Sequence, residues 1–83
     1  MEVRLSPQAI KYLNRMNEPT KGRIESALLN LAQESPQGDI KALKNRECYR
    51  LRVGDYRVLF GIANDKIVVT NIAPRGQIYK GGN

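Results

Sequence analysis

Residues 49–62 restrict the possible folds more than any other stretch, because they read as two strands joined by a two-residue turn. The first strand, residues 49–53, alternates apolar and basic side chains with a period of two. Gly54 and Asp55 follow, and glycine in the first position is typical of a type II′ hairpin turn. The partner strand is residues 56–62. This hairpin implies a sheet, and the apolar face of a sheet needs other elements to cover it.

The two-residue turn also determines which residues face each other across the hairpin. It sets Val53 opposite Tyr56. One step further from the turn, Arg52 lies opposite Arg57. Apolar side chains then share one face of the hairpin and arginines share the other, as in a sheet with one buried face. The apolar face comprises Tyr49, Leu51, Val53, Tyr56, Val58 and Phe60, and the opposite face carries Arg50, Arg52 and Arg57.

Two amphipathic helices are expected before the hairpin, and they can cover its apolar face. Ser6 and Pro7 predict the start of the first, since serine is a good N-cap and proline suits the first helical position. Residues 24–32 carry apolar side chains at helical spacing, the strongest helical pattern in the chain. A strand at residues 2–5 opens the sequence, and another is expected at residues 66–72.

These elements predict a single α+β domain over residues 1–83. We expect a small antiparallel sheet with an N-terminal helical hairpin packed on one face, in the order β-α-α-β-β-β. Residues 77–79 could add a short final strand. The longest apolar run is three residues, too short to span a bilayer, and the N-terminus has no apolar core of a signal peptide. With a single cysteine as well, we expect a cytoplasmic protein without membrane partners.

The net charge of +6 lies in the second half of the chain. Residues 1–39 carry five basic and five acidic side chains, whereas residues 40–83 carry nine basic and three acidic ones. This asymmetry favours a polyanionic partner, although a basic surface kept for solubility is the alternative. The chain has no histidine, which excludes histidine zinc ligands and a histidine general base.

The arginines of the hairpin are candidates for a phosphate site. Arg52 and Arg57 lie directly opposite each other, and like charges so placed cost roughly 0.2–1 kcal/mol per pair. The two strands contain no acid that would neutralise them or Arg50. A cluster kept at a cost to folding indicates an external anion, and the planar fork of arginine matches phosphate oxygens. The alternative is that these charges only protect the sheet from aggregation.

Two residues after the last expected strand extend the phosphate hypothesis. Arg75 follows Pro74, where a loop can bring it towards the arginines of the hairpin. Tyr79 could stack on a base, the usual way in which single-stranded RNA is held. Considered alone, Tyr79 fits ordinary packing better than a functional role.

Residues 49–58 resemble the signature hairpin of the RelE/ParE superfamily of bacterial toxins. Residues 72–79 are similar to its closing motif, in which an arginine follows a strand and a tyrosine comes four residues later. The resemblance extends over nearly the whole chain. It implies a RelE-like toxin of a type II toxin–antitoxin system, a ribosome-dependent mRNA endoribonuclease that needs no metal or cofactor. The implied partners are a cognate antitoxin protein, mRNA in the ribosomal A site and ribosomal RNA.

The same resemblance implies catalytic roles for Arg50, Arg52, Arg57, Arg75 and Tyr79. The first two replace lysines of the best-known RelE enzymes, and because arginine stays protonated they cannot act as general base. Tyr79 or a ribosomal RNA group remains a candidate for proton transfer. One alternative is a ParE-like toxin that inhibits DNA gyrase and cuts no RNA. Another is an inactive relative that only binds an antitoxin or nucleic acid. ParE-type members generally lack the closing arginine and tyrosine, which favours the nuclease.

Overall fold

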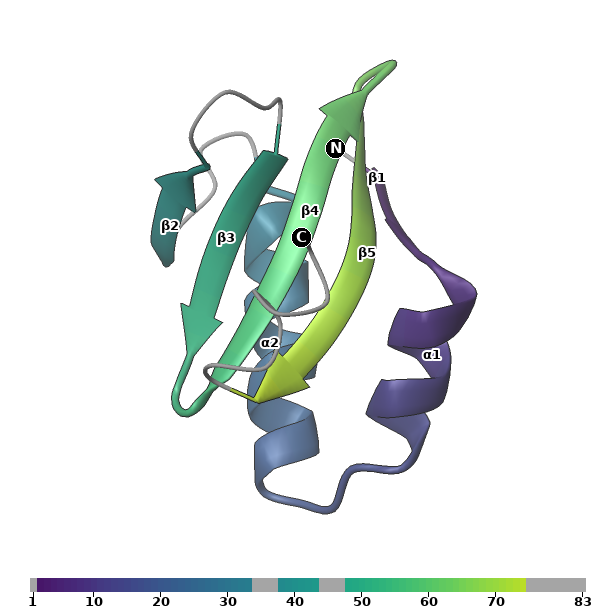
Figure 1. The fold of residues 1–83 in the computed structure, drawn as a ribbon, viewed down its shortest axis with the longest axis vertical. Helices are drawn as coiled ribbons and strands as arrows, with labels where there is room; N and C mark the ends of the chain where they lie inside the picture. The colour runs from purple at the N-terminus through teal and green to yellow at the C-terminus, as the bar shows by residue number, and fades with distance from the viewer. Residues whose placement is uncertain (1, 34–37, 44–47, 75–83) are drawn as a thin grey trace.

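The computed structural model describes residues 2–33, 38–43 and 48–74. In this part of the chain, two helices and five strands follow one another in the order β1, α1, α2, β2, β3, β4, β5 (Figure 1). Their bounds are β1 Glu2–Leu5, α1 Pro7–Asn14, α2 Thr20–Leu31, β2 Asp39–Ala42, β3 Cys48–Val53, β4 Tyr56–Ala63 and β5 Lys66–Pro74. The predicted α+β class and the helical hairpin are confirmed.

The five strands form one mixed sheet in the spatial order β1-β5-β4-β3-β2. β1 runs parallel to β5, whereas the other neighbours are antiparallel. The prediction of an entirely antiparallel sheet was therefore wrong at one edge. Parallel neighbours are joined by long crossovers rather than tight turns. Both helices and three strands separate β1 from β5 in the sequence, so no local pattern indicated the direction of β1.

The strand β2 was not predicted at all, and it forms the edge of the sheet beside β3. It is four residues long and contains a single β-branched residue, Ile40. Such a segment has little intrinsic preference for a strand, and it is ordered by pairing with its neighbour. Its position matters for the functional site, because β2 is the direct neighbour of β3, the strand that carries Arg50 and Arg52.

The predicted register of the β3–β4 hairpin is confirmed. Val53 pairs with Tyr56, and Arg52 pairs with Arg57. Gly54 has a φ of +57°, in the left-handed region that glycine adopts at little cost and that the first position of a type II′ turn requires. The alternation of side chains along the hairpin consequently sends apolar groups to one face of the sheet and arginines to the other.

Both helices contribute to a core on the apolar face of the sheet, and Figure 1 shows α2 behind the strands. The Ser6 hydroxyl accepts a hydrogen bond from the Ala9 N–H at 3.1 Å, which confirms the predicted N-cap of α1. Neither helix of the described residues is long and apolar enough to cross a membrane. The buried apolar side chains are Ala9, Leu13, Ile24, Leu28, Leu31, Leu51, Val58, Phe60, Ile67, Val69 and Ile72.

Candidate functional site

Three of the five predicted site residues come together on the sheet face opposite the helices. Arg50, Arg52 and Arg57, here called the arginine face, alternate along β3 and β4 with side chains that point into the core. Arg52 and Arg57 are direct partners across the hairpin. The other two predicted site residues, Arg75 and Tyr79, lie outside the described residues.

The three arginines differ in how far they reach into solvent. Arg57 is only 6% exposed. The side chain of Arg50 is 12% exposed, and that of Arg52 is 48% exposed. The arginine face is thus graded from a nearly buried charge on β4 to a half-exposed charge on β3. A ligand that reached Arg57 would be largely removed from water, and this strengthens its electrostatic interaction with the guanidinium.

The buried guanidinium nitrogens are incompletely paired. Nε and Nη1 of Arg57, and Nε of Arg50, have no hydrogen-bond partner within the part of the chain that the structure describes. Leaving a buried donor unpaired costs roughly 1–3 kcal/mol, and more when the group is charged. Arginine cannot escape this cost by losing its proton. Unpaired buried donors in native structures call for an explanation, and an arriving anion supplies one here.

An acidic residue that the sequence analysis did not include lies against the arginine face. Oδ1 of Asp39 is 3.5 Å from Nη2 of Arg50, and its Oδ2 is 3.4 Å from Nε of Arg52. The two hairpin strands carry no acid, as predicted, but Asp39 reaches their arginines from the neighbouring strand β2, where it pairs with Arg52 in the sheet register.

The strand β2 also adds a fourth basic residue to this side of the sheet. Lys41 pairs with Arg50, so the alternation of β2 places it on the same face as Asp39. The sequence offered one weak signal for both residues, the alternation of polar and apolar side chains in Asp39-Ile40-Lys41-Ala42. Asp39 contacts Arg50 and Arg52 but not Arg57, so it does not satisfy the two Arg57 nitrogens described above.

The end of β5 is tied to the first turn of α1. The Gln8 side chain accepts a hydrogen bond from the Ile72 N–H and donates one to the Ile72 carbonyl, both at 3.2 Å. The Ser6 hydroxyl donates to the Thr70 carbonyl at 2.7 Å. These contacts hold the strand up to Pro74, and in the sequence Arg75 follows directly. The first turn of α1 therefore fixes the end of β5, directly before the predicted site residue Arg75 in the sequence.

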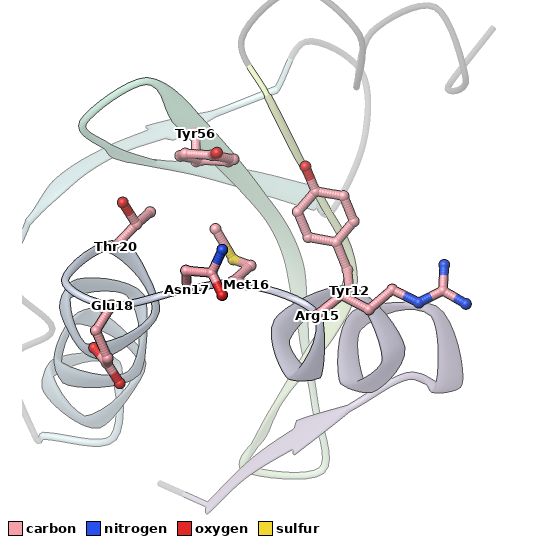
Figure 2. A pocket seen from close by; sticks show the side chains of 7 residues that line it. All are labelled: Tyr12, Arg15, Met16, Asn17, Glu18, Thr20 and Tyr56. Carbon is pink, nitrogen blue, oxygen red and sulfur yellow. The ribbon is translucent and has the colours of Figure 1, made fainter.

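A separate hollow of about 450 Å³ lies at the connection between the helices, on the apolar side of the sheet (Figure 2). Tyr12 and Tyr56 meet edge to face in its wall, with ring centroids 6.4 Å apart. Burial, and secondarily the neighbouring Tyr56, raises the pKa of Tyr12 above its ordinary value. Tyr12 is thus a neutral phenol at physiological pH. The residues that line the hollow are Tyr12, Arg15, Met16, Asn17, Glu18, Thr20 and Tyr56.

The arginine face is the stronger candidate of the two. Tyr56 projects towards the helices, whereas the next residue, Arg57, projects to the other side, so the sheet separates the hollow from the arginine face. Three guanidinium groups on adjacent strands can bind a phosphate and can stabilise additional negative charge that develops on it during a reaction. The hollow brings no comparable set of charges together.

Comparison with known proteins places this geometry in a family. Residues 3–79 match the family model described as the ParE toxin of the type II toxin–antitoxin system parDE. No curated protein sequence matches the chain. Several solved structures share its fold. A chain of the RelB–RelE antitoxin–toxin complex from Methanococcus jannaschii is 23% identical, with 96% of this chain and 99% of that chain covered and a TM-score of 0.79.

Two further structures show the same likeness. A chain of the archaeal RelE–RelB complex from Pyrococcus horikoshii is 25% identical, with 92% of this chain and 96% of that chain covered and a TM-score of 0.78. The isolated RelE toxin of E. coli is 13% identical, with 98% of this chain and 93% of that chain covered and a TM-score of 0.74. The resemblance inferred from the two sequence motifs is confirmed, and the chain belongs to the RelE/ParE family of toxins of type II toxin–antitoxin systems.

Proposed function

We propose that this toxin is a ribosome-dependent mRNA endoribonuclease that inhibits translation. The single observation that carries the proposal is Arg57, a nearly buried guanidinium whose Nε and Nη1 have no partner among the described residues, and which lies beside Arg52 and on the same face as Arg50. Such a group is costly in the free protein. It becomes favourable when a phosphate accepts its hydrogen bonds.

The proposed reaction uses the RNA itself as nucleophile. The 2′-hydroxyl oxygen bonds to the adjacent phosphorus in line, and the bond from phosphorus to the 5′-oxygen breaks. The 2′-hydroxyl loses its proton to a base, and the departing 5′-oxygen gains one. Negative charge accumulates on the phosphate oxygens in the transition state. Arg57, Arg52 and Arg50 would neutralise this charge from fixed positions, which lowers the barrier without any movement of the protein at the moment of reaction.

Proton transfer is assigned to other groups, because arginine stays protonated. Tyr79 of the closing motif and ribosomal RNA are the candidates, and Arg75 would add a further charge at the phosphate. The proposed enzyme depends on the ribosome because its own arginines supply charge stabilisation but no proton transfer. The ribosome would hold the mRNA in the geometry for in-line attack. Such positioning alone can remove a large part of the activation barrier.

A second candidate function is inhibition of DNA gyrase without RNA cleavage. It is favoured by the description of the matching family model, which is that of ParE toxins. This function would not require a buried guanidinium with free donors. Gyrase inhibition would also leave Arg75 and Tyr79 of the closing motif without a role. We therefore rank it below the nuclease.

We also propose a cognate antitoxin as the physiological partner, as in the RelB–RelE complexes to which the fold is similar. An open apolar groove of about 460 Å³ between β1 and the helices suits an amphipathic segment of such a partner. Leu29 in this groove is 70% exposed. The groove is lined by Val3, Leu5, Leu13, Glu25, Leu28 and Leu29.

Induced expression in bacteria tests the proposed activity. We expect rapid arrest of translation, with mRNA cut at defined codon positions. DNA damage signalling with intact mRNA would instead support gyrase inhibition. The double variant Arg57→Ala with Tyr79→Phe should lose toxicity. Its matched control, Arg23→Ala with Tyr12→Phe, changes the same residue types away from the arginine face and should stay toxic. Toxicity that survives the first double variant would contradict the assignment of catalysis to this face.

A further inference from the structure

Asp39 lies between two arginines of the arginine face and contacts each with a different carboxylate oxygen. The contacts are 3.5 Å to Arg50 Nη2 and 3.4 Å to Arg52 Nε. Nε and Nη donors are the ones with which arginine grips a phosphate in the bidentate manner. A carboxylate in contact with one such nitrogen of each arginine competes with a phosphate for these two side chains.

The contacts are loose, and this determines how Asp39 can act. Charge-assisted hydrogen bonds between nitrogen and oxygen measure about 2.7–2.9 Å, so distances of 3.4 and 3.5 Å describe Coulomb contacts rather than tight bonds. The Asp39 side chain is 53% exposed, and exposed ion pairs contribute little to stability. A carboxylate held so weakly can be displaced by an incoming phosphate at small cost. Even with Asp39 in place, Nε of Arg50 has no partner in the part of the chain that the structure describes.

We propose that Asp39 is a built-in counter-ion of the arginine face, which neutralises Arg50 and Arg52 in the free protein and lowers the affinity of this face for RNA phosphates. The inference rests on the proposed function, in that it takes the arginine face as the RNA-binding surface. Arg57 is the charge that Asp39 leaves unpaired, so the counter-ion limits binding without masking the whole face. An RNA that binds must displace the carboxylate or tolerate its repulsion.

The variant Asp39→Asn removes the charge and keeps the size of the side chain. We expect it to bind a short single-stranded RNA oligonucleotide roughly three- to tenfold more tightly. That factor corresponds to one unit charge about 6 Å from a phosphate at an effective dielectric constant of about 40–80. The slope of log affinity against log salt concentration should also steepen by about 0.7, since one more cation on the protein faces the RNA.

Two matched variants separate a local effect from a change in net charge. Asp65→Asn gives the same net charge, but Asp65 lies in the β4–β5 turn, about 20 Å along β4 from Arg57 at the usual rise per residue. Its φ of +60° also suits asparagine. Asp65→Asn should leave affinity and salt slope near the wild-type values. Asp39→Glu retains a carboxylate and should also bind RNA like the wild type.

The outcomes distinguish this inference from the proposed function. Tighter binding and a steeper salt slope in Asp39→Asn, but not in Asp65→Asn or Asp39→Glu, support the counter-ion. Equal or weaker binding at the wild-type slope, by a protein that still binds RNA, would overturn the counter-ion and leave the nuclease proposal standing. Absence of RNA binding in both wild type and Asp39→Asn would overturn the counter-ion, whereas the nuclease proposal, which leaves positioning of the mRNA to the ribosome, is tested by mRNA cleavage on ribosomes. Thermal unfolding verifies that each variant is folded, and Asp39→Ser serves as a second neutral variant.

Discussion

Replacing Arg57 with methionine should stabilise the protein and strongly lower its activity at the same time. The side chain is nearly buried, and its Nε and Nη1 lack hydrogen-bond partners among the described residues. Methionine fills a similar length with an apolar, adaptable chain. The substitution removes buried unpaired donors that cost roughly 1–3 kcal/mol, so we expect the free energy of unfolding to rise by about that amount.

The same substitution removes a donor that we propose contacts the phosphate. Loss of one such donor typically lowers the rate of the chemical step by about 10²–10³-fold. The assays are urea unfolding followed by circular dichroism, and cleavage of mRNA on purified ribosomes. The expected rise in melting temperature is about 4–8 °C for each kcal/mol in a domain of this size. The two measurements should therefore move in opposite directions, as expected where a functional site is held at the expense of stability.

Arg52→Met is the matched control, because this side chain is 48% exposed and contacts Asp39. Its unfolding free energy should change by no more than about 1 kcal/mol, the value of an exposed ion pair. A loss of stability in Arg57→Met comparable to a core truncation, about 2–5 kcal/mol, would refute the reasoning. Arg57 would then be a structural arginine with partners that satisfy it, rather than a charge held ready for RNA.

Three further substitutions test how the site is supported. Ser6→Ala removes the N-cap of α1 and should lower the unfolding free energy by about 0.5–2 kcal/mol in chemical denaturation. Gln8→Ala leaves the N–H and the carbonyl of Ile72 without their side-chain partner, so we expect the unfolding free energy to fall by about 1–3 kcal/mol. We also expect weaker RNA cleavage, because the end of β5 would be displaced. Unchanged cleavage would show that α1 does not position the closing motif. Because the pKa of Tyr12 is raised in the folded state, its stabilising contribution is complete below pH about 10 and is lost as pH rises through the folded pKa. Tyr12→Phe should therefore flatten the alkaline decline of the unfolding free energy, and an unaltered decline would contradict the cause given for the shift.

The hairpin and the helices could be predicted because their signals are local. A period of two along β3 and β4 and a glycine at the turn were sufficient for the register, and the Ser6 cap was sufficient for the start of α1. The faces of these elements follow directly from their periodicity. The sheet face on which Arg50, Arg52 and Arg57 lie was therefore predictable from the sequence.

The remaining features depend on contacts between distant parts of the chain. β2 acquires its structure from pairing with β3, and β1 takes its direction from the free edge of β5. Asp39 reaches the arginine face only because β2 joins the sheet, and no pattern near Arg50 or Arg52 signals its arrival. The near burial of Arg57 could not be predicted either. An alternating pattern tells the two faces of a strand apart, but it does not show how far each side chain is buried.

Stability and function in this fold depend on the same turn. The side chains of a strand change face at every residue, so a slip of one position would turn the arginines into the core and expose Leu51 and Val58. Gly54, with its positive φ, prevents that slip by closing the hairpin over two residues. The hydrophobic effect that buries one face consequently holds the guanidinium groups together on the other, against their mutual repulsion. A cluster that repels itself can then persist in the free protein, where Asp39 is the only acid of the described residues in contact with it, and we propose that it stays available for a phosphate.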